Sequence, residues 1–144
     1  MGDQQKDNAW LKLYRSVSLC LSLIFAIVGL IFLFIPDDVF LLFYSISRLL
    51  GYPESSLQSF GLYQVLAVGY MYLATLLAYY MNKYPENTFF PLLLIHGKSA
   101  SSLLSLCLFF VHQPCLLLLT NGIVDGMIAI GVFVLYKKSR ETRQ

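Results

Sequence analysis

The two residues of this sequence best suited to chemistry are Lys98 and Asp125, each the only charged residue of a long apolar stretch. A charge near the middle of a bilayer is costly, so it usually faces the protein interior and marks a site. A lysine and an aspartate can pair there, or the carboxylate can hold a proton or a cationic solute. Any function of Lys98 and Asp125 must therefore depend on charge inside an apolar environment.

The two charges are predicted to lie at similar depth. The stretches 88–111 and 115–136 are joined by only three residues, so they must form a hairpin. At about 1.5 Å per residue, Asp125 lies about 17 Å from the hairpin tip, level with Ser101 and Ser102, and Lys98 lies roughly one turn further away. A lysine stem can bridge one turn, so an ion pair is compatible with the sequence without being required by it.

Polar and small residues accompany the two charges on the same helix faces. Ser101, Ser102 and Ser105 follow Lys98 at three- and four-residue spacing, and Asn121 precedes Asp125 by one turn. Gly122 and Gly126 have the spacing that lets two membrane helices approach closely. The predicted ligand or ion-pair site comprises Lys98, Asp125, Asn121, Ser101, Ser102, His96, Tyr70 and Tyr72.

Motifs for cofactors or catalysis are incomplete. Gly97-Lys98-Ser99 resembles the end of a phosphate-binding loop, but Leu92 occupies the position of its first glycine. His96 and His112, the two histidines, share one predicted helix and lie roughly four turns apart, which does not suit a haem with two histidine ligands. Lys98 and Ser102 are the residue types of a serine–lysine catalytic pair, yet no oxyanion site accompanies them. We therefore predict no cofactor, no metal ligand and no catalytic residue.

The elements that must hold these residues are predicted to be membrane helices. The 144 residues are 58% hydrophobic and 12% charged, with a mean hydropathy of +0.68. Soluble domains carry about 25% charged residues, so lipid is the expected surrounding. The pattern predicts one all-α domain over 1–144, with four transmembrane helices in an antiparallel bundle at about 16–35, 60–81, 88–111 and 115–136. The aromatic segment at about 38–50 is too short to span and is predicted to be an interfacial helix.

The basic residues predict the orientation of the chain. Eight of the ten lysines and arginines fall on one side if both termini are cytoplasmic, which places Arg48 opposite and Lys98 within the membrane. Basic residues are enriched on the cytoplasmic side of membrane proteins. We therefore predict a multi-pass integral membrane protein with cytoplasmic N- and C-termini.

Three uses of the charged hairpin remain open at this level. The protein could be a transporter or binder of a small or lipidic ligand. It could instead be an accessory or assembly subunit of a larger complex, in which the charge pair only fixes the register of the helices. An intramembrane enzyme acting on lipid is the least supported, because no nucleophile or metal cluster is evident.

Membrane lipids are the expected partners. The first predicted span has Ser18, Ser22, Ala26 and Gly29 at helical spacing, which predicts a face that packs against another helix of the same chain. As the alternative, such stripes on three of the predicted spans offer contact faces for a second copy or another subunit. Nucleic-acid binding has no support, because no basic stripe with interleaved aromatic residues faces water.

Overall fold

The computed structural model describes residues 2–51, 60–111 and 114–141 of the chain. In these residues the chain forms five helices: α1 (Gly2–Phe34), α2 (Pro36–Leu49), α3 (Phe60–Lys83), α4 (Phe89–Val111) and α5 (Leu116–Glu141). Four of them, all except α2, are long and apolar enough to cross a membrane. The prediction of an all-helical protein with four such helices is therefore confirmed.

The helix ends differ from the predicted ends where polar residues continue a helix. α1 begins at Gly2 and α5 extends to Glu141, because the polar segments before and after the apolar stretches stay helical. α4 begins at Phe89, whose backbone N–H donates to the side-chain oxygen of Asn87 at 2.9 Å. The Asn87 side chain thus satisfies one of the free N–H groups of the first turn.

The sequence at α2 explains its short length. Pro36 occupies the first turn, where its missing N–H costs nothing, and Asp37 and Asp38 favour the positive end of the helix dipole. Gly51 follows the helix with φ of 72°, a left-handed conformation that glycine adopts without steric cost. Its N–H donates to the Arg48 carbonyl at 3.2 Å and helps to close the helix.

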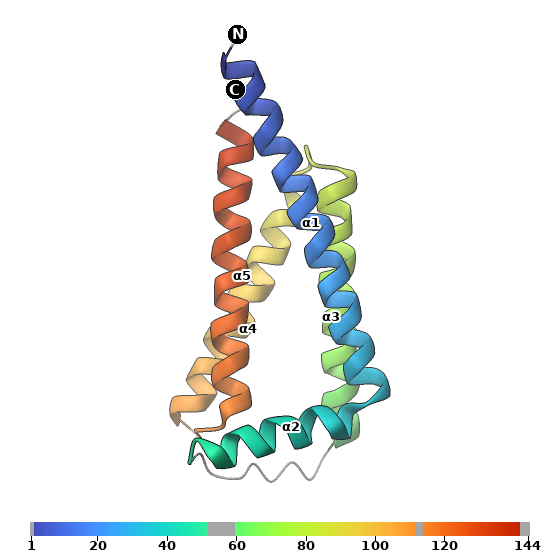
Figure 1. The fold of residues 1–144 in the computed structure, drawn as a ribbon, viewed down its shortest axis with the longest axis vertical. Coiled ribbons are helices and arrows are strands. Elements are labelled where there is room, and N and C mark those ends of the chain that lie inside the picture. The colour runs from blue at the N-terminus through green and yellow to red at the C-terminus, as the bar shows by residue number, and fades with distance from the viewer. Residues whose placement is uncertain (1, 52–59, 112–113, 142–144) are drawn as a thin grey trace.

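The long helices associate mainly as two pairs, α1 with α3 and α4 with α5. Figure 1 shows the pairs leaning together at the end where both chain termini lie and diverging toward the other end. There α2 lies crosswise to the long helices, and it contacts both α1 and α5. The two helix pairs are therefore close together at the end with the chain termini and further apart at the other end, where α2 bridges them.

The α1/α3 pair is held by small residues and by side-chain hydrogen bonds to backbone carbonyls. Ser18 and Ser22 of α1 and Ala74 and Ala78 of α3 are all buried. Ser22 donates to the Thr75 carbonyl at 3.1 Å. Small side chains let the backbones approach, which provides packing and exposes carbonyls to such donors.

Two further hydrogen bonds secure this pair near its ends. The Gln64 amide donates to the Phe32 carbonyl at 3.2 Å, and the Asn82 amide donates to the Arg15 carbonyl at 2.6 Å. The Phe32 carbonyl lies in the last turn of α1, where Pro36 has no N–H to offer it, so the Gln64 amide supplies its donor. Together with the buried small residues of α1, these bonds hold α1 against α3, so this face of α1 serves contacts inside the chain.

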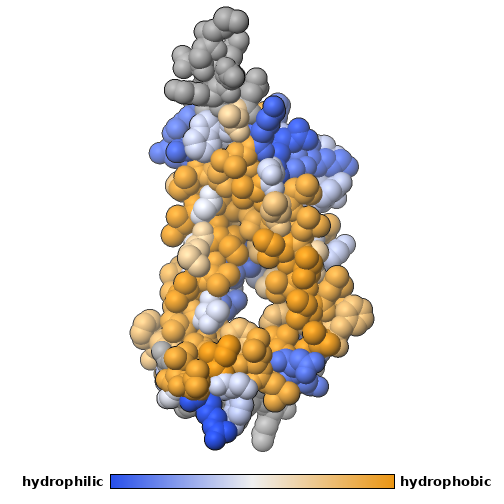
Figure 2. All heavy atoms as spheres, viewed as in Figure 1, coloured by the Kyte–Doolittle hydropathy of each residue, from blue (hydrophilic) through white to orange (hydrophobic). Residues whose placement is uncertain are grey.

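Apolar side chains cover the outside of the helices. Leu23, Leu103, Phe110 and Ile130 are each more than half exposed, with exposed fractions of 57%, 68%, 78% and 67%. Figure 2 shows this hydrophobic surface between hydrophilic regions at the two ends of the molecule. Such a surface suits lipid contact, because most of its hydrophilic residues lie at the two ends of the molecule.

Candidate functional site

Lys98 and Asp125 form a closed ion pair. The Nζ atom of Lys98 lies 2.7 Å from Oδ1 of Asp125, and the two side chains are 1% and 3% exposed. The sequence left this contact open, and the structure makes it direct. Because each charge is expensive in an apolar interior, the attraction between them offsets the cost of burying either one.

The Lys98 ammonium also contacts aromatic rings from the other helix pair. It lies 4.7 Å from the centre of the Phe25 ring on α1 and 4.8 Å from that of Tyr70 on α3. Both distances fall within the range of a cation–π contact. Together with Asp125 on α5, these contacts join Lys98 of α4 to each of the other three long helices.

Gly122 and Gly126 explain how α4 and α5 come close enough for this pair. A Cβ atom added at Gly126 would lie 2.9 Å from Oγ of Ser102, and one at Gly122 would lie 2.8 Å from the Leu106 side chain. The Ser102 hydroxyl donates to the Gly122 carbonyl at 2.6 Å. The close-approach role predicted from the glycine spacing is thus visible as a contact within the chain.

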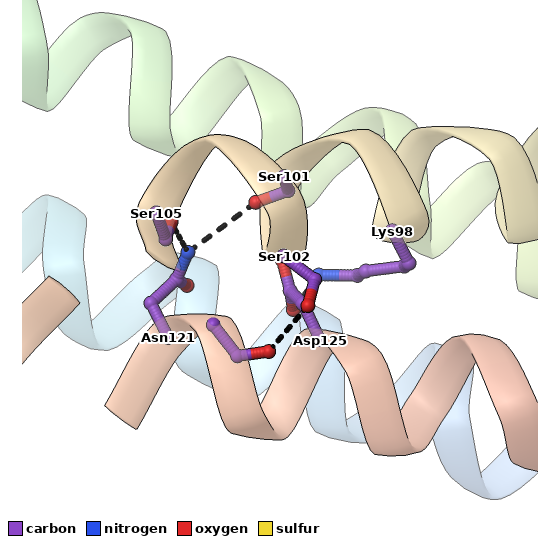
Figure 3. Close-up of polar contacts among 7 residues, drawn as sticks. Lys98, Ser101, Ser102, Ser105, Asn121 and Asp125 are labelled. Carbon is purple, nitrogen blue, oxygen red and sulfur yellow. Dashed lines mark hydrogen bonds and ion pairs between the residues drawn. The ribbon is translucent and has the colours of Figure 1, made fainter. Parts of the chain in front are cut away.

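Asn121 links the same two helices one turn away from Asp125. Its amide nitrogen donates to Oγ of Ser105 at 2.8 Å and to Oγ of Ser101 at 3.3 Å. Figure 3 shows Asn121 pointing from α5 toward the serines of α4, with Lys98 and Asp125 alongside. Asn121 and Ser101 are only partly buried, whereas Lys98 and Asp125 are fully enclosed.

Tyr70 completes this set from α3. Its ring lies against the Lys98 ammonium, and its hydroxyl interacts with Ser101. A Cβ atom added at Gly97 would lie 3.9 Å from the same hydroxyl, so the glycine leaves space beside it. We call the six residues Lys98, Ser101, Ser102, Asn121, Asp125 and Tyr70 the polar cluster.

Two of the predicted site residues lie outside the polar cluster. Tyr72 is 65% exposed on α3, and His96 is exposed on α4. Each stands two residues from a member of the cluster, Tyr70 or Lys98, which corresponds to a rotation of roughly 200° around a helix. The structure therefore turns both side chains toward the outside of the molecule.

Phe25 contacts the Lys98 ammonium but is not among the site residues predicted from the sequence. It is 3% exposed and lies over the Lys98 ammonium. A phenylalanine within an apolar helix gives no sign of whether it faces lipid or a buried cation. The small residues at helical spacing on α1 identified the internal face, and Phe25 lies three residues after Ser22 on that face.

The polar cluster has hydrogen-bond acceptors to spare. Oδ2 of Asp125 is buried and has no hydrogen-bond partner among the described residues. In the same part of the chain, the Asn121 amide nitrogen donates hydrogen bonds while its oxygen receives none. Buried acceptors are normally satisfied, which makes Oδ2 of Asp125 unusual, whereas the oxygen of the partly exposed Asn121 can receive a donor from outside the chain.

An opening lies between the two helix pairs. Figure 2 shows it passing through the molecule between the two helix pairs, above α2, with hydrophilic atoms on its rim on the side of α4 and α5. The strongly hydrophilic residues in the apolar length of α5 are Asn121 and Asp125, which lie in the half of the helix nearer α2. The opening and the cluster are therefore at similar depth.

The arrangement does not assemble a serine–lysine catalytic pair. The Lys98 ammonium is held by Asp125, and the Ser102 hydroxyl donates to the Gly122 carbonyl. A lysine that serves as a base must be neutral and within reach of the serine proton. Within the described residues there is also no group of three or more histidine, cysteine or acidic side chains that could hold a metal ion.

Comparisons of the chain with protein-family models, with curated proteins and with solved structures found no match.

Proposed function

We propose that the chain is a multi-pass membrane protein that crosses the bilayer as an antiparallel four-helix bundle with both termini in the cytoplasm. The support is the distribution of charge. Lys83 and Lys138 belong to the same end as the termini, together with Trp10, whose ring lies 4.4 Å from Nζ of Lys138. Basic and aromatic residues of this kind suit the cytoplasmic headgroup layer. α2 then lies at the opposite interface.

The proposed activity is binding of a small or lipidic ligand, with transport as one use of that binding. The observation that carries it is the partly exposed polar face of Asn121 and Ser101, which has an acceptor without a donor among the described residues and lies at the depth of an opening between the helix pairs. Polar groups that face an apolar region without full partners are expensive, and a ligand that supplies donors removes that cost. The closed Lys98–Asp125 pair lies one turn along α5 from Asn121.

The site is tested by what the purified protein carries. We expect a molecule to co-purify with the wild-type protein and to fall about fivefold or more in Asn121→Leu, since about 1 kcal/mol per lost hydrogen bond corresponds to that factor. Gln64→Leu is the matched control, because it also removes a partly buried amide that bonds across two helices, but within the α1/α3 pair. Mass spectrometry of extracts provides the measurement. Equal amounts in all three proteins would contradict the proposal.

A second candidate function is that of an accessory or assembly subunit in which the ion pair only sets helix register. The contact of Lys98 with Phe25, Tyr70 and Asp125 favours it, because one side chain then positions all four long helices. Purification in mild detergent separates the two functions. A second protein that co-purifies in fixed ratio supports the subunit, whereas an isolated chain with a bound small molecule supports the ligand site.

A further inference from the structure

The walls of the opening determine what can fill it. It lies between helices whose outer surfaces are apolar, at a depth where bilayer hydrocarbon surrounds the protein. A void there loses dispersion contacts, and water there finds few polar partners. A flexible hydrocarbon chain from the bilayer can fill the opening and make dispersion contacts with the apolar walls without leaving polar groups unpartnered. The opening is thus suited to the tail of a lipid.

The rim of the opening determines the polar end of such a lipid. Asn121 lies at the depth of the opening and is partly exposed, and its amide oxygen receives no hydrogen bond among the described residues. Asp125 lies one turn further on the same face of α5, but it is enclosed with Lys98 and is not available to a ligand. A partly exposed acceptor without a donor calls for a ligand group that donates.

The charge distribution around the opening does not favour an anionic headgroup. The charged residues in the apolar lengths of α1, α3, α4 and α5 are Lys98 and Asp125, and they neutralise each other at 2.7 Å. The Lys98 ammonium is further enclosed by Phe25 and Tyr70, so it is not available to an anion in the opening. A carboxylate or phosphate at the depth of Asn121 would meet an acceptor and no free charge from these four helices, which is unfavourable in an apolar region.

We propose that the ligand of this site is an uncharged lipid with a hydroxyl headgroup, which enters sideways between the two helix pairs and donates its hydroxyl to Asn121. The proposal rests on the ligand-binding function proposed above and specifies its chemical class. Its tail occupies the opening above α2. A diacylglycerol is the simplest probe with these properties.

Photo-crosslinking in vesicles tests the lipid class. The protein is reconstituted in phosphatidylcholine with a trace of diacylglycerol that carries a diazirine in one acyl chain. We expect labelling of α4, α5 and α2 that excess unlabelled diacylglycerol suppresses, and labelling about fivefold weaker in Asn121→Leu, from the loss of about one hydrogen bond. Gln64→Leu should label like the wild type. Labelling that does not saturate, or that Asn121→Leu leaves unchanged, overturns the proposal.

Two comparison probes separate the headgroup from the tail. A fatty acid with the same diazirine chain should label several-fold less at a pH where it is ionised, and equal labelling by it would overturn the hydroxyl assignment. A photoreactive glycerol without a chain should not label the site. If the glycerol labels in an Asn121-dependent way while the diacylglycerol does not, the lipid class is wrong and the ligand site proposed above stands. If Asn121→Leu changes neither probe nor the co-purified molecule, both proposals fail.

Discussion

At the scale of single residues, the most consequential contact is the one between Lys98 and Asp125. Each charge alone would be prohibitive where it lies, since both side chains are almost completely enclosed. Attraction between them and the two aromatic rings over the ammonium offset the cost of removing them from water. Breaking the pair and removing it altogether should therefore have different effects.

Single substitutions should be far more damaging than the double substitution. Lys98→Met or Asp125→Asn leaves one buried charge without its partner, and we expect a loss of about 3–5 kcal/mol in the free energy of unfolding. Combining Lys98→Met with Asp125→Leu removes both charges and should recover most of that loss. Denaturant unfolding in detergent micelles measures all three variants. A double variant as unstable as the sum of the singles would show that the pair contributes through something other than charge.

The role of Asn121 cannot be predicted from its residue type and helical position alone. Its position one turn before Asp125 predicted a shared face, and the structure places it on Ser101 and Ser105 as expected from that face. What makes it a candidate ligand contact is its partial exposure. Exposure depends on how far the α1/α3 pair lies from it.

At the scale of elements, α4 and α5 form the most specific unit of the molecule. Their backbones approach because two glycines face Ser102 and Leu106, and the approach is what brings the charges to 2.7 Å. The third glycine of α5, Gly131, has no atom within 4 Å of the position of an added Cβ. The three glycines therefore offer an internal comparison.

Alanine at the glycines should act according to what it meets. Gly126→Ala forces the Ser102 hydroxyl to move and should cost about 1–3 kcal/mol of unfolding free energy, as overpacking usually does. Gly131→Ala should be neutral or stabilising by up to about 1 kcal/mol, because alanine is the better helix former. Thermal unfolding in one detergent compares them. If both substitutions have the same effect, the close approach at Gly126 is not required for stability.

At the scale of the whole molecule, the two helix pairs are joined mainly at one end. Buried residues from all four long helices meet there in one core, which includes Tyr14, Ala78, Leu94 and Val132. Toward α2 the pairs diverge (Figure 1). The contacts of the Lys98 ammonium with Phe25 and Tyr70 are a further link between the two pairs.

Cysteine labelling should test the proposed crossing of the membrane. In a background where Cys20, Cys107 and Cys115 are replaced by alanine, Asp37→Cys and Glu86→Cys place single thiols at exposed positions near opposite ends of the molecule. A membrane-impermeant maleimide added to sealed, right-side-out vesicles should label the first and not the second. Permeabilised vesicles are the control, in which both should react. Labelling of both before permeabilisation would contradict the topology.

The sequence alone determined the membrane character, the four long helices and the pairing of the last two. Each conclusion depends on composition or on a short connection, which do not change with packing: an apolar stretch of about 20 residues spans a bilayer wherever its neighbours lie. Helical spacing also determined which polar residues of α4 and α5 share a face. The similar depth of Lys98 and Asp125 followed from counting residues along a hairpin.

Only the tertiary structure decided the rotation of each helix and the angle between the pairs. Rotation turned Tyr70 toward Lys98 and Tyr72 outward, and it placed Phe25 over the ammonium. The angle between the pairs left the opening above α2. Both quantities result from many small packing contacts between helices that are apolar all round, so no single residue in the sequence encodes them.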